Sequence, residues 1–324
     1  MNVFLDFEKP IADLEGKIEE LRQMGQGDGV DDGARTQGIN IDEEIARLQV
    51  KAAQLIAETY ARLTPWQKAQ VARHPARPHF SDYATSLIAD FTPLAGDRLY
   101  GDDKAVVAGL GRFRGRPVAI VGQEKGNDTK SRLKHNFGMA LPEGYRKVQR
   151  LFEMANRFGL PVISLVDTAG AYPGVGAEER GQAEAIARST QACLGLTTPF
   201  VATIIGEGGS GGAVAIAAAN KVYMLEHAIY SVITPEGCAS ILLRDGTKAE
   251  GAAKAMKITA QDLIGLRIID RIIPEPLGGA HTDPATTIRT VGDAIEEELQ
   301  GLLQFSASEL KAQRAQRFLA IGRS

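Results

Sequence analysis

Residues 200–213 read FVATIIGEGGSGGA, and this stretch decides how the middle of the chain folds. An apolar run comes first, glycines follow at residues 206–212, and the small-residue stretch AVAIAAA continues from residue 213. This order predicts a buried strand that leads through a loop into the N-terminus of a helix. Ligands of α/β proteins bind at the carboxyl ends of strands, so the loop is a candidate site.

Three interpretations fit the glycines of this loop. Gly206, Gly208 and Gly211 match the dinucleotide-binding pattern G-x-G-x-x-G. Gly208, Ser210 and Gly212 match the hydrolase nucleophile elbow G-x-S-x-G. The third interpretation uses only backbone, because the first N–H groups of a helix are unpaired and can bind a developing oxyanion.

The first two interpretations lack supporting residues. Glu226 stands where a ribose-binding acid is expected, but the helix has room for only about eight residues, short for a parallel crossover. A nucleophilic Ser210 needs a base, and His227 abuts the apolar stretch AIYSVI. His281 lies in a loop in which Asp283 suits a turn better than a triad. We therefore favour the backbone interpretation, with Ser210 as a spacer.

Composition sets limits on the function of the whole chain. The 324 residues are 44% hydrophobic and 24% charged, as in a globular protein, and the net charge of −3 gives no general attraction to nucleic acid or membrane. Cys193 and Cys238 form no C-x-x-C motif, so we expect no zinc ribbon and no bound metal. No signal-peptide pattern or membrane-length apolar run occurs, so a cytoplasmic protein is expected.

The N-terminal part is predicted to be a helical arm, residues 1–79. Apolar residues recur at helical spacing over residues 10–24 and 42–63. Between them, residues 25–38 are rich in glycine and aspartate, and we expect a weakly ordered connector. Residues 64–67, TPWQ, have the spacing of a capping box that starts another helix.

Residues 80–324 are predicted to form an α/β domain, because short apolar strands alternate with helices. Helices are expected over residues 142–157 and 178–194, with two amphipathic segments around residues 285–320. The predicted strands are PVAIVG (117–122), PVISLVD (161–167), PFVATII (199–205), KVYML (221–225), AIYSVI (228–233) and RIIDRII (267–273).

A second glycine-rich loop, TAGAYPGVG, follows Asp167 at the end of another predicted buried strand. If the two strands are neighbours, the two loops meet at one edge of the sheet. Glycines that only make tight turns are the alternative.

Six stretches together resemble the alpha subunit of bacterial acetyl-coenzyme A carboxylase carboxyltransferase, and the match runs nearly end to end. Many members have proline where this chain has Ala169, and residues 25–38 are a second departure. The matching stretches are INIDEEIARL (39–48), NFGMALPEGYRK (136–147), DTAGAYPGVGAEERGQAEAIAR (167–188), IGEGGSGGAVAI (205–216), ITPEGCASIL (233–242) and IIPEPLGGAH (272–281).

The resemblance implies a crotonase-like core, in which ββα units stack into a superhelix, with a helical N-terminal arm for beta-subunit contact and C-terminal helices. It implies an α2β2 assembly whose separate beta subunit carries the zinc ribbon and most of the coenzyme A site. The implied reaction transfers the carboxyl group from carboxybiotin, on the biotin carboxyl carrier protein, to acetyl-coenzyme A, giving malonyl-coenzyme A for fatty acid synthesis. ATP is used only by the separate biotin carboxylase.

The resemblance also implies the site residues. Gly211 and Gly212 donate N–H groups to the ureido oxygen of carboxybiotin, and Gly170 with Ala171 completes the oxyanion hole. The expected residues around the bound biotin are Gly208, Gly209 and Ser210.

Two alternatives remain for the function, and one surface feature stays open. One alternative to the carboxyltransferase function is a scaffold that positions the beta subunit without catalytic groups. The other is a coenzyme A hydratase or isomerase of the same fold, for which Glu207 is the local acid. Seven basic residues against two acids in residues 125–150 indicate either a solvated face or attraction of coenzyme A phosphates or an acidic carrier surface. The basic residues are Lys125, Lys130, Arg132, Lys134, Arg146, Lys147 and Arg150.

Overall fold

The computed structural model describes residues 3–26 and 41–323. Apart from its first two residues, which end a helix, the predicted connector at residues 25–38 lies outside the described residues. Among the described residues, no helix combines the length and the apolar character needed to cross a membrane.

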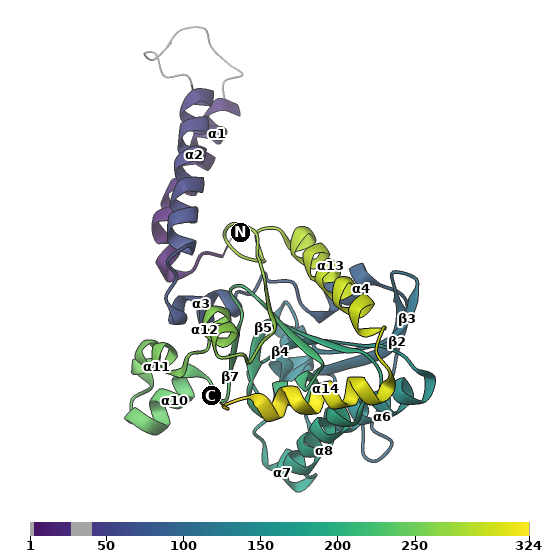
Figure 1. Ribbon diagram of the computed structural model, residues 1–324. Coiled ribbons are helices and arrows are strands. Elements are labelled where there is room, and N and C mark those ends of the chain that lie inside the picture. The colour runs from purple at the N-terminus through teal and green to yellow at the C-terminus, as the bar shows by residue number, and fades with distance from the viewer. Residues whose placement is uncertain (1–2, 27–40, 324) are drawn as a thin grey trace, which may run out of the picture.

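The helices predicted over residues 10–24 and 42–63 are present. A short 3-10 turn, η1 (Asp6–Glu8), leads into α1 (Lys9–Gln26), which packs along α2 (Ile41–Tyr60), and this pair projects from the rest of the molecule (Figure 1). The predicted capping box starts α3 (Pro65–Ala72): the Thr64 hydroxyl accepts from the Gln67 N–H at 3.2 Å, and the Gln67 side chain accepts from the Thr64 N–H at 2.8 Å.

A single mixed sheet forms the centre of the molecule, with strand order β1-β2-β3-β4-β5-β6-β8 and with β7 paired to the end of β5. The first three strands pair antiparallel and all later pairs are parallel. The strands are β1 Ile88–Pro93, β2 Val106–Phe113, β3 Arg116–Gln123, β4 Val162–Thr168, β5 Phe200–Gly209, β6 Lys221–Leu225, β7 Ile229–Ser231 and β8 Arg271–Ile273.

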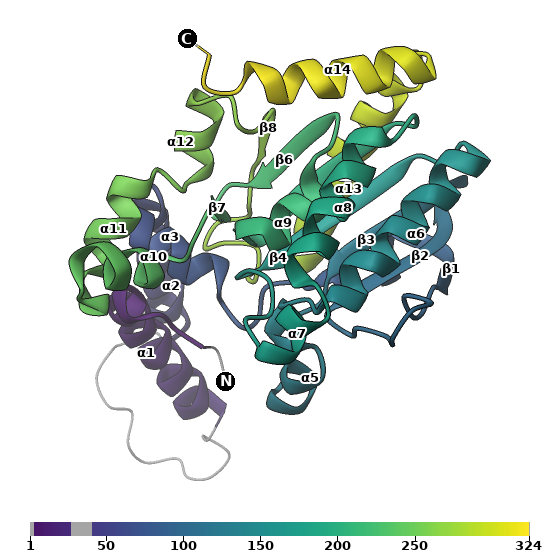
Figure 2. The same cartoon turned by 90° about the horizontal axis from the view of Figure 1, so that it is seen from below.

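Helices cover both faces of the sheet. Helices α6, α8 and α9 lie on one face, α4 and α13 on the other, and α14 crosses beside α8 (Figures 1 and 2). The remaining helical elements are α4 Phe80–Leu87, α5 Thr129–Lys134, η2 Asn136–Gly138, α6 Pro142–Phe158, α7 Val175–Glu179, α8 Gln182–Gly195, α9 Ser210–Ala217, α10 Pro235–Cys238, η3 Ala239–Leu243, η4 Gly246–Lys248, α11 Ala249–Met256, α12 Ala260–Gly265, α13 Pro284–Leu302 and α14 Ala307–Ala320.

The structure corrects three predictions. The expected loop at residues 206–212 is absent from this described region, because β5 runs through Gly209 and α9 starts at the next residue. The predicted strand 267–273 is shortened to β8, since Arg267 adopts a φ of +58° after α12. The helix expected at residues 178–194 is split into α7 and α8 at Gly181, where φ is +80°.

Arg314 on α14 fastens this C-terminal helix to the core. Its side chain is fully buried and donates to the carbonyl oxygens of Cys193 and Thr198 at 3.1 and 3.2 Å, as well as to Leu196 and Asn220. The cation thus lies at the C-terminal end of α8, where carbonyl groups are unpaired and the helix dipole is negative. Burial nevertheless lowers the pKa of Arg314 to about 10.

We predict that Arg314→Met destabilises the chain by about 3 kcal/mol or more, because several buried oxygens lose their donor at once. Urea denaturation at neutral pH measures this difference. Lys311→Met, on the exposed face of the same helix, removes the same charge and should change stability by no more than about 0.5 kcal/mol. Equal stability of the two variants would contradict the assigned role of Arg314.

Candidate active site

The ends of β4 and β5 bring the two glycine-rich segments together, which confirms their predicted proximity. The strands pair in parallel, with Thr168 opposite Gly208. A Cβ atom on Gly209 would lie 2.1 Å from the Ala169 carbonyl oxygen, and one on Gly212 would lie 2.8 Å from the Gly170 carbonyl carbon. Only glycine fits at these two positions, because the opposing atoms belong to backbone.

The first turn of α9 presents backbone N–H groups at this contact. Gly209 is the N-cap and supplies no side-chain hydrogen bond, so the N–H groups of Gly211 and Gly212 have neither a cap nor an intrahelical acceptor. On the opposite segment, the Gly170 N–H donates to the Thr168 hydroxyl at 3.1 Å, which occupies it. The Ala171 N–H has no acceptor within residues 3–26 and 41–323.

Ser210 lies at the turn from strand to helix, with a φ of +54°. Such a conformation costs a non-glycine residue about 1–2 kcal/mol, so the surrounding structure imposes it. Neither downstream histidine is placed to act as its base: the His227 ring packs on Tyr60, and the His281 ring stacks on His74 at 3.7 Å. The strained turn therefore presents the neighbouring backbone without a catalytic triad.

The dinucleotide interpretation also lacks structural support. Helix α9 has eight residues, as the sequence suggested, and ends before β6. The Glu226 carboxylate accepts from the Glu275 N–H at 3.3 Å and so is engaged in a loop contact.

A partly buried ion-pair network, which no sequence pattern indicated, holds the strand ends beside this contact. The Lys125 ammonium lies 2.8 Å from an Asp167 oxygen and 2.7 Å from a Glu207 oxygen. The other Glu207 oxygen accepts from Arg73 Nε at 2.6 Å, and Arg73 also pairs with Glu236. The network therefore links β4 and β5 to α3 and α10.

The network fixes the charge of Glu207. Burial by itself would raise the pKa of this carboxyl group, but Lys125 and Arg73 outweigh it and lower the pKa to about 2. The same two carboxylates raise the pKa of Lys125 against the effect of its burial. Glu207 is thus a carboxylate with both oxygens occupied, which suits neither a general acid nor a general base at neutral pH.

Four of the seven basic residues at 125–150 are engaged in contacts within the chain. Lys125 belongs to the network, Arg146 lies 3.4 Å from Asp97 and Lys147 lies 2.8 Å from Asp102. Arg150 donates to the carbonyl oxygens of two residues in the loop before β2. The remaining three, on the short helix α5, are Lys130, Arg132 and Lys134.

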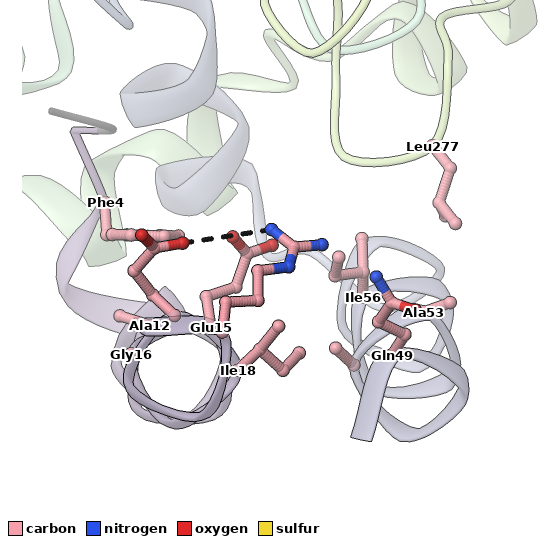
Figure 3. A pocket seen from close by; sticks show the side chains of 12 residues that line it. Phe4, Ala12, Glu15, Gly16, Ile18, Gln49, Ala53, Ile56 and Leu277 are labelled. Atoms are coloured by element: carbon pink, nitrogen blue, oxygen red, sulfur yellow. Dashed lines mark ion pairs between the residues drawn. The ribbon is translucent and has the colours of Figure 1, made fainter. Parts of the chain in front are cut away.

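Two pockets are relevant to the location of a ligand site. A pocket of about 200 Å³ adjoins the ion-pair network and the glycine contact, and its lining includes Lys125, Arg132, Phe137, Asp167, Ala169 and Glu207. A larger groove of about 540 Å³ lies between α1 and α2, with Ile18, Gln49 and Ile56 along it (Figure 3). We place the candidate site at the ends of β4 and β5, where the glycine contact and the ion-pair network lie beside the smaller pocket and Ala169 belongs to both the contact and the pocket lining. Within the described ranges, no group of three or more His, Cys, Asp or Glu residues is arranged to hold a metal ion.

Several solved structures share the fold of this chain. Transcarboxylase 12S, solved with methylmalonyl-coenzyme A and methylmalonic acid, matches with a TM-score of 0.56 at 21% identity, over 69% of this chain and 42% of that one. A Pseudomonas malonate decarboxylase hetero-tetramer in complex with coenzyme A matches with a TM-score of 0.56 at 17% identity, over 68% and 89%. The fold is the crotonase-like fold of carboxyltransferases, as predicted.

Sequence relatives narrow this class to one family. The family model described as acetyl co-enzyme A carboxylase carboxyltransferase-like matches residues 4–322. The acetyl-coenzyme A carboxylase carboxyl transferase alpha subunit of Methylobacterium nodulans is 64% identical over 323 residues, covering 100% of this chain and 99% of the relative. That of Rhizobium rhizogenes is 62% identical over 324 residues, with 100% of both covered. The chain belongs to the acetyl-coenzyme A carboxylase carboxyltransferase alpha-subunit family, which confirms the resemblance.

We predict that Glu207→Gln weakens the fold at neutral pH by about 3 kcal/mol, because Lys125 and Arg73 lose a buried partner. The folded pKa of Glu207 is depressed from 4.5 to about 2, so its contribution is present above pH 4.5 and disappears as the pH falls towards 2. The variant should therefore lose less stability than the native chain over this window.

Urea denaturation followed from pH 7 to pH 2 tests this prediction. Glu275, whose pKa is also lowered to about 2, titrates in the same window, so the slope should decrease without vanishing. Glu184→Gln on the exposed side of α8 is the matched control and should leave both the stability and its pH dependence unchanged. An unchanged slope in Glu207→Gln would contradict the assignment.

Proposed function

We propose that the chain forms the biotin side of an acetyl-coenzyme A carboxylase carboxyltransferase. Carboxyl transfer is the chemistry of its family. In this proposal the carboxyl group of carboxybiotin, held on the biotin carboxyl carrier protein, passes to acetyl-coenzyme A and gives malonyl-coenzyme A. The biotin carboxylase that charges the carrier and uses ATP is a separate component.

The observation that supports this proposal most directly is the contact between two bare backbone segments. The N–H groups of Gly211 and Gly212 carry the positive end of the α9 dipole, and the facing segment supplies the Ala171 N–H, which has no acceptor in the part of the chain that the structure describes. Such donors stabilise negative charge that develops on a carbonyl oxygen. Since the Gly170 N–H is bound to Thr168, we do not assign Gly170 as a donor: its backbone is the surface that Gly212 approaches, and its φ of +154° favours glycine.

The ureido group of biotin fits these donors, because it presents a carbonyl oxygen to the N–H groups and needs a backbone surface without side chains. When bound, carboxybiotin supplies the carboxyl group and, after its departure, a base for the methyl group of acetyl-coenzyme A. The backbone donors orient the ureido oxygen and stabilise its negative charge. Gly208, Gly209 and Ser210 line the turn beneath it, and Ser210 contributes no nucleophile.

The proposed partners follow from the same family relationship. A separate beta subunit completes an α2β2 assembly and supplies the zinc ribbon and most of the coenzyme A site. The projecting helices α1 and α2, which belong to the predicted arm of residues 1–79, offer a surface for it, including the groove along Ile18 and Ile56 (Figure 3). The assembly is proposed to be cytoplasmic.

Two rival functions are less well supported. A hydratase or isomerase needs a free acid beside the oxyanion hole, whereas both oxygens of Glu207 are held by Lys125 and Arg73. A scaffold without catalytic groups has no use for a helix N-terminus left uncapped at a close backbone contact. Substitution of the glycines separates the scaffold from the catalytic function.

The single chain is predicted to be inactive on its own, because the acetyl-coenzyme A side of the site lies on the beta subunit. Purified chain given carboxybiotin and acetyl-coenzyme A should form no malonyl-coenzyme A, and activity should appear when the beta subunit is added. The beta subunit alone is the control. Sustained product formation by the rigorously purified single chain would refute obligate partnership.

Gly212→Ala should lower kcat about 10²-fold or more while assembly with the beta subunit is retained. The added methyl group would lie 2.8–3.1 Å from backbone atoms of Gly170 and Ala171 and would force the two donor segments apart. Gly211→Ala should lose less, because its methyl group would meet only the flexible Ile186 side chain. Gly251→Ala on α11, with open space around the position, is the control for the change of residue type.

These variants are measured after size-exclusion chromatography has verified that each one assembles. Near-native carboxyl transfer by assembled Gly212→Ala would favour the scaffold. Ser210→Ala, in contrast, should keep most of the native rate, and its complete inactivity in an assembled enzyme would restore the nucleophile interpretation.

A further inference from the structure

Gln123, the last residue of β3, connects the two halves of the proposed oxyanion hole. Its side chain is 1% exposed. The amide oxygen accepts from the Asp167 N–H at 3.1 Å, and the amide nitrogen donates to the Gly212 carbonyl oxygen at 3.0 Å. Only this orientation of the amide satisfies both partners, because one is a donor and the other an acceptor.

The position of Gln123 makes this bridge consequential. Backbone pairing between β3 and β4 ends at Gly122 and Leu165, so the Gln123 side chain continues the connection to Asp167 after the ladder has stopped. Asp167 begins the segment that carries the Ala171 N–H. Gly212 belongs to the first turn of α9, whose N–H groups form the other half. The planar amide of Gln123 therefore links Asp167, at the start of the segment that carries Ala171, to Gly212 in the first turn of α9.

We propose that Gln123 is a positioning residue that sets the spacing and orientation of the two donor segments. This inference rests on the proposed function of those segments. Gln123 touches neither of the reacting groups and acts through the Asp167 and Gly212 backbone. Since catalysis by oriented donors depends on sub-ångström placement, release of the bridge should slow the chemical step more than it weakens substrate binding.

Gln123→Met provides the main test, because methionine keeps the length and apolar volume of the side chain but removes both hydrogen bonds. In the assembled enzyme we expect kcat to fall about 10- to 100-fold, with KM for acetyl-coenzyme A within about twofold of native. Without any substrate or biotin, amide hydrogen exchange should increase in both residues 168–174 and 210–213.

Ser189→Ala is the matched control. The Ser189 hydroxyl is buried and donates to the Ala215 carbonyl oxygen at 2.6 Å, so this variant removes a side-chain bond to the same helix at a point beyond the first turn. It should keep kcat within about twofold of native and leave hydrogen exchange over residues 168–174 unchanged. A purely structural role for Gln123 would make the two variants behave alike.

Gln123→Glu carries the test if the methionine variant fails to assemble. Glutamate retains the acceptor for the Asp167 N–H but places a carboxylate against the Gly212 carbonyl oxygen, so the same loss of kcat is expected. Native kcat together with native hydrogen exchange in an assembled Gln123 variant would overturn the inference. If Gly212→Ala is impaired while the Gln123 variants are active, only the positioning role fails; if Gly212→Ala is also active, the proposed oxyanion hole itself is wrong.

Discussion

The contact between the ends of β4 and β5 is the constraint on which the rest of the site depends. Parallel pairing brings the backbone of Ala169 and Gly170 against Gly209 and Gly212 at distances that leave no volume for a Cβ atom. Side chains are thereby excluded, and the functional groups left at the contact are peptide N–H groups. Their placement has to be held from outside, by the Gln123 amide and by buried charges.

Those buried charges also connect the N-terminal arm to the chemistry. Arg73 and Arg77 follow α3 in the sequence, yet Arg73 binds Glu207 at the end of β5, and Arg77 donates to the Ile205 carbonyl oxygen at 2.9 Å and to Glu275 at 2.7 and 2.8 Å. The boundary at residue 79 stays a prediction, but the last residues before it help to hold the strand ends. A partner that binds the arm would therefore contact a part of the chain that is connected, through α3 and the ion pair of Arg73 with Glu207, to the donor segments.

Sequence alone predicted the elements whose pattern is local. The capping box at Thr64, the apolar strands β3 to β6 and the meeting of the two glycine-rich segments needed only spacing and strand order. Strand β2 was missed because Gly109 and Gly111 break its apolar pattern, and these glycines admit the Phe91 and Ile88 side chains of β1. Strand β1 was missed because most of its residues are exposed and form no apolar run. The bridge of Gln123 and the network around Glu207 join residues far apart in the chain, which no local pattern encodes.

The anchoring of α14 has a consequence for biosynthesis. The last strand of the described sheet ends at Ile273, but Arg314, whose guanidinium group binds carbonyl groups at the end of α8, is synthesised later. Until Arg314 is in place, these carbonyl groups lack their donor and can be satisfied only by water, at a position that is buried in the complete fold. The core beside α8 is therefore closed to solvent only after all the strands have been synthesised. A nascent chain that ends before Arg314 exposes this part of the core to proteases and chaperones.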